Sequence, residues 1–93
     1  MILSFHDRTT ERLFHGEPVP GVSRDVSAVA YRKLIQLHTV TRLHDLRIPP
    51  GNRLKALQGR RAGTFSLRVN RQWRITFRWH DGAAHDVLFE DYH

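Results

Sequence analysis

The segment from Trp73 to Trp79 constrains the fold of this chain more than any other. It alternates apolar and polar residues without an error, and its apolar positions are Trp73, Ile75, Phe77 and Trp79. This period of two is typical of a half-buried β-strand. An Asp81-Gly82 pair follows and leads into a second apolar run, Val87–His93, which indicates an antiparallel hairpin. A slip of one residue would bury arginines, so the register of the strand is firmly set.

The opposite face of the predicted sheet is cationic. Because side chains alternate along a strand, Arg74 and Arg78 point away from the apolar face, and Arg68 does so in the preceding run, Thr64–Val69. Arginine keeps its charge at all relevant pH values and binds phosphate through two parallel hydrogen bonds. The predicted sheet therefore exposes a face that suits a phosphodiester.

Charge along the whole chain supports this interpretation. The net charge is +6, and ten of the fifteen Lys and Arg residues lie between Arg42 and Arg78, a span that holds only one of the nine acids, Asp45. Such a concentration predicts a directed site for a polyanion rather than a uniformly basic surface. The loop arginines of this span that we expect to contact RNA or the ribosome are Arg47, Arg53, Arg60 and Arg61.

Length and composition bound the other possibilities. Ninety-three residues, 1–93, are expected to form a single domain. No apolar run approaches the ~18 residues of a membrane helix, and the chain has no Cys, so we expect a cytoplasmic protein without a membrane partner. The seven histidines lack the His-x-x-x-His spacing of a zinc helix, and we expect neither a metal nor another cofactor.

The order of the remaining elements predicts an α+β fold. A short N-terminal strand precedes a helix capped by Asp7 and a second helix, 24–38, capped by Ser23. Pro49-Pro50-Gly51 marks the passage from helices to sheet, because it permits neither helix nor interior strand. A three-stranded antiparallel meander completes the chain, and the helices are expected to cover one of its faces.

Several motifs together resemble a known family. They are Gly51-Asn52-Arg53-Leu54-x-x-Leu57-x-Gly59-x-Arg61-x-Gly63-x-x-Ser66, Gln72-Trp73-Arg74-Ile75-Thr76-Phe77 and Asp91-Tyr92-His93. The chain thereby resembles the HigB-like toxins of the RelE superfamily over nearly its whole length. The resemblance implies a compact ribonuclease fold and metal-independent cleavage of mRNA on the translating ribosome, in the 30S A site. It also implies a HigA-like helix-turn-helix antitoxin as partner.

The resemblance assigns roles residue by residue. Arg74 matches the family's strand arginine at the scissile phosphate, where it would stabilise the charge of the transition state. Asp91, Tyr92 and His93 match the C-terminal trio, in which His or Tyr transfers protons and the carboxylate orients a partner or holds the 2′-hydroxyl. Lys55 stands where well-known members carry histidine. This departure leaves two roles open for Lys55, phosphate binding and proton transfer.

Two other classes of function also fit the charge. One is a non-catalytic basic module that binds nucleic acid or the ribosome, and the other is an interaction protein whose basic face receives an acidic partner. The C-terminal Asp91-Tyr92-His93 favours an enzyme over both, because phosphate binding alone gains nothing from a carboxylate beside the cations. Growth arrest and cleavage assays would separate the three.

Overall fold

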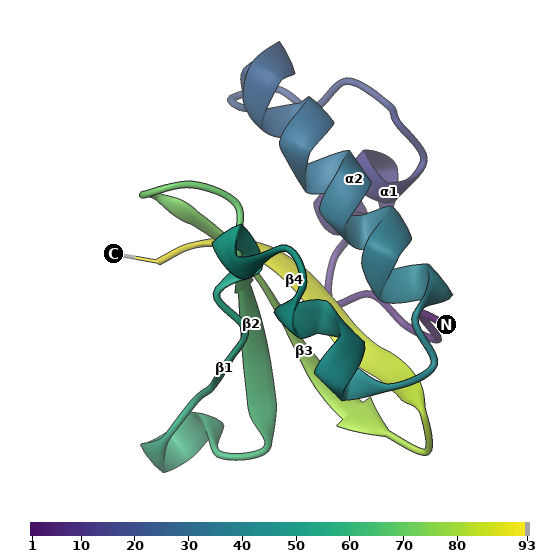
Figure 1. Cartoon of the computed structure of the whole chain (residues 1–93). Helices are drawn as coiled ribbons and strands as arrows, with labels where there is room; N and C mark the ends of the chain where they lie inside the picture. Colours follow the sequence, from purple (N-terminus) through teal and green to yellow (C-terminus); the bar gives the residue numbers. More distant parts are fainter. Residues whose placement is uncertain (93) are drawn as a thin grey trace.

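The computed structural model describes residues 1–92 of the chain. Within them lie α1 (Arg8–Phe14), α2 (Arg24–Thr39), the 3₁₀ turns η1 (Leu43–Arg47), η2 (Pro50–Asn52) and η3 (Gly59–Arg61), and the strands β1 (Lys55–Ala56), β2 (Thr64–Arg68), β3 (Trp73–His80) and β4 (Ala83–Asp91). The strands form one antiparallel sheet in the order β1-β2-β3-β4, and both α-helices lie on one side of it (Figure 1). The predicted α+β class is confirmed, and the two-residue β1 is added at the edge of the meander. Among residues 1–92, no helix is both long and apolar enough to cross a membrane.

Local capping explains where the helices begin. The Asp7 carboxylate accepts a hydrogen bond from the Thr10 N–H at 2.9 Å, and the Ser23 hydroxyl accepts one from the Val26 N–H at 3.2 Å. Each bond satisfies an amide that has no partner within its helix. Both predicted caps are confirmed, and α2 ends one residue later than expected.

The N-terminal segment covers the outer edge of β4. Ile2 and Phe5 form single parallel bridges to Ala84 and Val87, which is all the strand character that the predicted N-terminal strand shows. Farther along, the Thr10 hydroxyl accepts a hydrogen bond from the Phe89 N–H at 2.9 Å. These contacts pair an edge whose amides would otherwise be exposed to intermolecular pairing.

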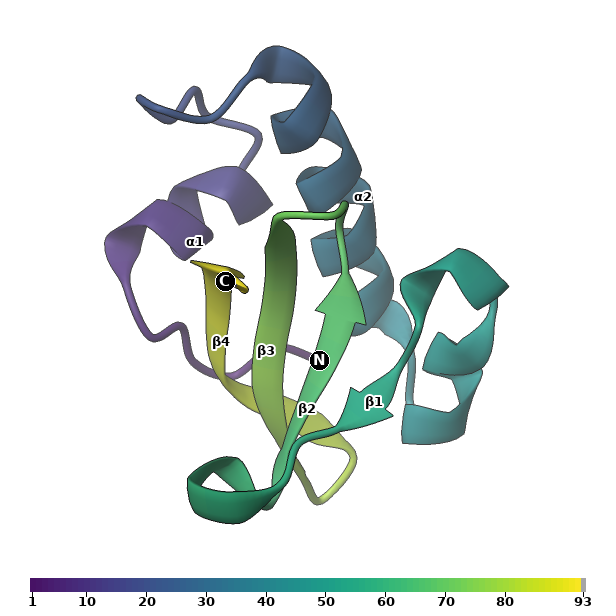
Figure 2. The same ribbon diagram turned by 90° about the vertical axis from the view of Figure 1, so that its left-hand side faces the viewer.

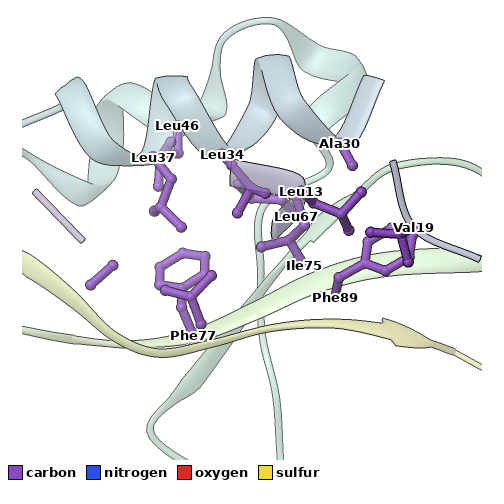
Figure 3. Packing of buried hydrophobic residues seen from close by; sticks show 12 residues of the cluster. Leu13, Val19, Ala30, Leu34, Leu37, Leu46, Leu67, Ile75, Phe77 and Phe89 are labelled. Atoms are coloured by element: carbon purple, nitrogen blue, oxygen red, sulfur yellow. The ribbon is translucent and has the colours of Figure 1, made fainter. Parts of the chain in front are cut away.

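The core lies between α2 and the helix-facing side of the sheet. Ala30, Leu34 and Leu37 recur at helical spacing and are fully buried against the sheet. Figure 3 shows them facing the side chains of Leu13, Leu67, Ile75, Phe77 and Phe89. Burial of each large side chain contributes about 2 kcal/mol, so this face of the sheet holds its register firmly. Its opposite face is left open (Figure 2).

The β3–β4 hairpin contains a register shift that decides which side chains share the open face. Asp81 and Gly82 both have positive φ and form a two-residue loop, as the Asp-Gly pair predicts. The pairing then shifts between Thr76 and Arg78, at a β-bulge where Asp86 has φ of 52°. Beyond the bulge, Glu90 lies opposite Arg74 in the ladder, while Asp91 lies opposite Trp73.

A buried asparagine anchors the chain between the helices and the sheet. Asn52 is 1% exposed and donates to the Leu46 carbonyl at 3.1 Å and to the Gln36 side chain at 3.0 Å. Its carbonyl oxygen accepts a hydrogen bond from Lys33 Nζ at 2.7 Å. Burial, followed by the charges of Arg32 and Arg68, lowers the pKa of Lys33. These bonds fix the segment that leads directly into β1 and Lys55.

Candidate active site on the open face of the sheet

Arg74 is fixed in the middle of the open face. Its Nη1 donates to the hydroxyl of Ser66 at 3.2 Å, and Ser66 is fully buried on the neighbouring strand β2. Its guanidinium carbon lies 4.3 Å from the centre of the Tyr92 ring, which is cation–π geometry. The planar group is therefore oriented on two sides while its charge remains accessible from the open face.

At its C-terminal end the described chain leaves β4 and projects outward on the open side of the sheet, toward the viewer in Figure 2. This path brings Tyr92 over Arg74 and close to β1, where the Lys55 ammonium donates to the Tyr92 hydroxyl at 3.1 Å. Lys55 and Tyr92 are 37 positions apart in sequence, and both are exposed. Three of the predicted site residues, Lys55, Arg74 and Tyr92, thus form one cluster.

The cluster changes the acidity of the tyrosine. The hydrogen bond from Lys55 and the positive charge of that ammonium lower the pKa of the Tyr92 hydroxyl, and the charges of Arg74 and Arg61 act in the same direction. Each of these interactions favours the phenolate over the neutral phenol. A tyrosine whose pKa moves toward neutrality transfers protons more readily at physiological pH.

A second group, formed by Arg61, Thr76 and Glu90, lies beside the first, and of its members only Arg61 was predicted as a site residue. Both Nη atoms of Arg61 donate to the carboxylate of Glu90 at 2.8 Å, and the Thr76 hydroxyl donates to the same carboxylate at 2.6 Å. The Arg61 hydrogen bond is the largest effect that lowers the pKa of Glu90, and the same bond raises the pKa of Arg61. Glu90 is therefore ionised and firmly held at neutral pH.

The other members of the predicted C-terminal trio lie differently. Asp91 is the ladder partner of Trp73 and is two residues from Phe89, so the alternation of the strand assigns it to the helix-facing side of the sheet. Its carboxylate accepts a hydrogen bond from the Gln72 side chain at 3.0 Å. His93 lies outside the described residues. On the side of Arg74, the acidic residue that the register supplies is Glu90.

The remaining predicted RNA contacts are spread around the open face. Arg78 and Arg61 line a hollow of about 160 Å³ together with His6. Arg60 is exposed on η3, and Arg53 is exposed directly after η2 with a φ of 46°.

Two further arginines complete the set of predicted RNA contacts. Arg47 borders a shallow hollow of about 240 Å³ beside β1, next to Leu54. Arg68 is half-buried at the end of β2 and donates to the Asn70 carbonyl at 3.2 Å. Arg68 is the ladder partner of Arg74, so these two arginines and Arg78 share the open face, whereas Arg47 lies on η1.

The site residues that sequence reasoning missed are Ser66, Thr76 and Glu90. Thr76 and Ser66 belong to the polar positions of two alternating strands, so the same pattern that placed Arg74 on the open face also places them there. The face on which Glu90 lies could be predicted only from the position of the bulge in β4. Within residues 1–92, no group of three His, Asp or Glu side chains is arranged to hold a metal ion.

A family model matches almost the whole chain. Residues 3–93 match the model of a RelE-like toxin of the type II toxin–antitoxin system HigB. The chain belongs to this family of HigB-like toxins. The expected class, a toxin of a type II system with endoribonuclease activity, is confirmed, and an antitoxin is the partner that membership of such a system entails.

Individual relatives agree with the family. The chain is 38% identical over 85 residues to Toxin HigB-1 of Vibrio cholerae serotype O1, covering 90% of each chain. It is 36% identical over 98 residues to Endoribonuclease HigB of Proteus vulgaris, covering both chains completely. A crystal structure of a YafQ mutant from E. coli superposes with a TM-score of 0.50 at 22% identity, over 80% of this chain and 88% of that one, and supports the fold.

Proposed function

We propose that the chain cleaves mRNA on the translating ribosome, in the 30S A site, and thereby stops translation and growth. The observation that carries the proposal is the setting of Arg74, which lies between the Ser66 hydroxyl and the Tyr92 ring with the Lys55 ammonium close by. Oriented cations beside an acidified phenol suit a reaction that develops negative charge and moves protons.

The reaction proposed is transesterification within the RNA. The 2′-oxygen forms a bond to the adjacent phosphorus as the bond from phosphorus to the 5′-oxygen breaks. One proton leaves the 2′-hydroxyl and one is delivered to the departing 5′-oxygen. The products are a 2′,3′-cyclic phosphate and a 5′-hydroxyl. RNA supplies its own nucleophile, so the protein must stabilise charge and move two protons.

The residues divide these tasks. Arg74 binds the non-bridging oxygens of the scissile phosphate, where the negative charge increases in the transition state. Tyr92 donates the proton to the 5′-oxygen, and Lys55 supports it by holding the hydroxyl and by attracting the phosphate. On the grounds of the family resemblance, His93 is assigned as the acceptor of the 2′-hydroxyl proton. Asp91 is assigned to orienting that terminus.

The surrounding arginines are assigned to the bound message and the ribosome. Arg68 and Arg78 lie on the same face as Arg74, and the exposed arginines Arg47, Arg53 and Arg60 add positive charge in the connecting segments. An open face without an enclosing cleft gives little positioning on its own. Positioning by the ribosome would supply the orientation that the small protein lacks.

The proposed partner is a HigA-like helix-turn-helix antitoxin, and the proposed location is the cytoplasm, where translating ribosomes are found. A type II system requires that the antitoxin neutralise the toxin in the compartment in which the toxin acts. A gene for a helix-turn-helix protein directly beside the toxin gene would support this assignment.

The test is expression of the wild-type protein and of Arg74→Ala without antitoxin. We expect the wild type to arrest growth and to produce 5′-hydroxyl ends on translated message. Arg74→Ala should remain folded and lose about 100-fold or more in cleavage rate, the effect of removing one transition-state donor. Binding to ribosomes without any new RNA ends would instead identify a non-catalytic binding module.

A further inference from the structure

The open face contains a carboxylate directly opposite its principal cation. Glu90 and Arg74 are ladder partners in the β3–β4 pair. Side chains at such positions start about 5 Å apart, and opposite charges there attract one another. Glu90 nevertheless bonds to Arg61 and Thr76, while Arg74 bonds to Ser66 and stacks on Tyr92. The two opposite charges are thus held by different partners.

We propose that Arg61 is a positioning residue that keeps Glu90 away from Arg74. By holding the carboxylate with both Nη atoms, Arg61 leaves the Arg74 guanidinium available for the scissile phosphate. This inference rests on the proposed function of Arg74 as the phosphate-binding group. It gives Arg61 a role inside the site rather than a direct contact with RNA.

The geometry of the ion pair supports this role. Both carboxylate oxygens accept a bond from Arg61 at 2.8 Å, which is the bidentate arrangement that binds carboxylates most specifically. The third bond comes from Thr76, which is 1% exposed and is fixed in the middle of β3. Glu90 is therefore held on the side facing Thr76 and η3.

Loss of Arg61 would release this carboxylate beside Arg74. Glu90 would keep its bond to Thr76, but its second oxygen would have lost a strong donor, and Arg74 is the cation opposite it in the ladder. A carboxylate attached to the same sheet competes with RNA at a high effective concentration. It would also repel the phosphate that Arg74 has to bind.

The inference makes a specific prediction about paired substitutions. Arg61→Ala should lower kcat/KM for cleavage of ribosome-bound message by about tenfold, the effect of weakening one charge-assisted contact. Glu90→Gln in the same molecule should restore the rate to within about threefold of Glu90→Gln alone, because the competing charge is gone. Arg32→Ala, which removes an exposed arginine from α2, is the matched control for a lost positive charge.

A second measurement does not depend on cleavage. Inorganic phosphate is titrated into each variant while the Nε–H resonance of Arg74 is followed by NMR. Phosphate should shift this resonance in the wild type and in the double variant, and the shift should be strongly reduced in Arg61→Ala. Circular dichroism melts of all variants verify that the fold is retained.

Two results would overturn the inference. One is full activity together with an unchanged phosphate response in Arg61→Ala. The other is a double variant that is as impaired as Arg61→Ala, which would show that Arg61 acts on RNA directly. If the wild type fails to cleave RNA at all, the proposed function fails. The phosphate titration would still decide whether Arg61 controls access to Arg74.

Discussion

Replacing Tyr92 by phenylalanine removes one oxygen from the site and leaves the ring stacked against Arg74 in place. The lost oxygen is the acceptor of the hydrogen bond from Lys55 Nζ at 3.1 Å. The ring stays 4.3 Å from the Arg74 guanidinium carbon, so the cation–π contact is retained. The substitution therefore isolates proton transfer from phosphate binding.

The expected effect falls on kcat. A positioned general acid contributes about 100-fold to 10,000-fold, so Tyr92→Phe should lower the single-turnover cleavage rate by at least about 100-fold. KM should change by less than about threefold because Arg74 keeps its orientation. Tyr31→Phe is the matched control, since Tyr31 is 40% exposed like Tyr92 but lies on α2.

The pH dependence gives the second arm of this experiment. Lys55 lowers the pKa of Tyr92, chiefly through its hydrogen bond, from the ordinary value of 10.0. An acid is active while protonated, so the wild-type rate should fall as the pH rises through this lowered pKa. The inflection should disappear in Tyr92→Phe and move to higher pH in Lys55→Ala. A Tyr92→Phe protein that cleaves within threefold of the wild type, with an unchanged pH profile, would refute the assignment.

Three further predictions concern the framework of the site. Thr10→Val leaves the buried Phe89 N–H on β4 without a hydrogen-bond acceptor. The substitution should lower the free energy of unfolding by about 2 kcal/mol, or Tm by about 10 °C, in thermal melts with Thr10→Ser as the control. Asn52→Leu removes the acceptor of the Lys33 ammonium and should cost about 2–3 kcal/mol in urea unfolding, whereas equal midpoints would contradict the anchoring role. The Arg61 hydrogen bond lowers the pKa of Glu90, so its stabilisation is complete above the ordinary value of 4.5 and is lost as the pH falls through the lowered value. Acid titration followed by circular dichroism should show this loss in the wild type and little of it in Glu90→Gln.

Much of the fold was predictable because its signals are local. The period of two in Trp73–Trp79 fixes a strand and its buried face, and Asp7 and Ser23 mark helix starts through bonds to amides three residues away. The Asp81-Gly82 loop is specified by two residues that accept positive φ. None of these signals depends on where the rest of the chain lies.

The bulge in β4 was not predicted from these local signals. Ala84 and Val87 are both fully buried, although their odd spacing would place them on opposite faces of a regular strand. An extra residue between them resolves the conflict, and Asp86 supplies it with a φ of 52°. A comparison of the apolar parity on both sides of Asp86 would have predicted the shift. If the two strands are paired outward from the Asp81-Gly82 loop without the bulge, Glu90 falls opposite Trp73 instead of Arg74.

The group around Arg61 depends on tertiary structure and has no local signal. Gly59 and Gly63 permit the positive φ values that fold this loop, yet they do not specify which strand the loop approaches. The loop is held against β4 by the ion pair between Arg61 and Glu90, which are 29 positions apart in sequence. The bulge determines the face of Glu90, and Glu90 in turn determines where Arg61 rests. One inserted residue in β4 therefore governs which charges surround Arg74, so the local electrostatics of the site are a consequence of sheet register rather than of any motif.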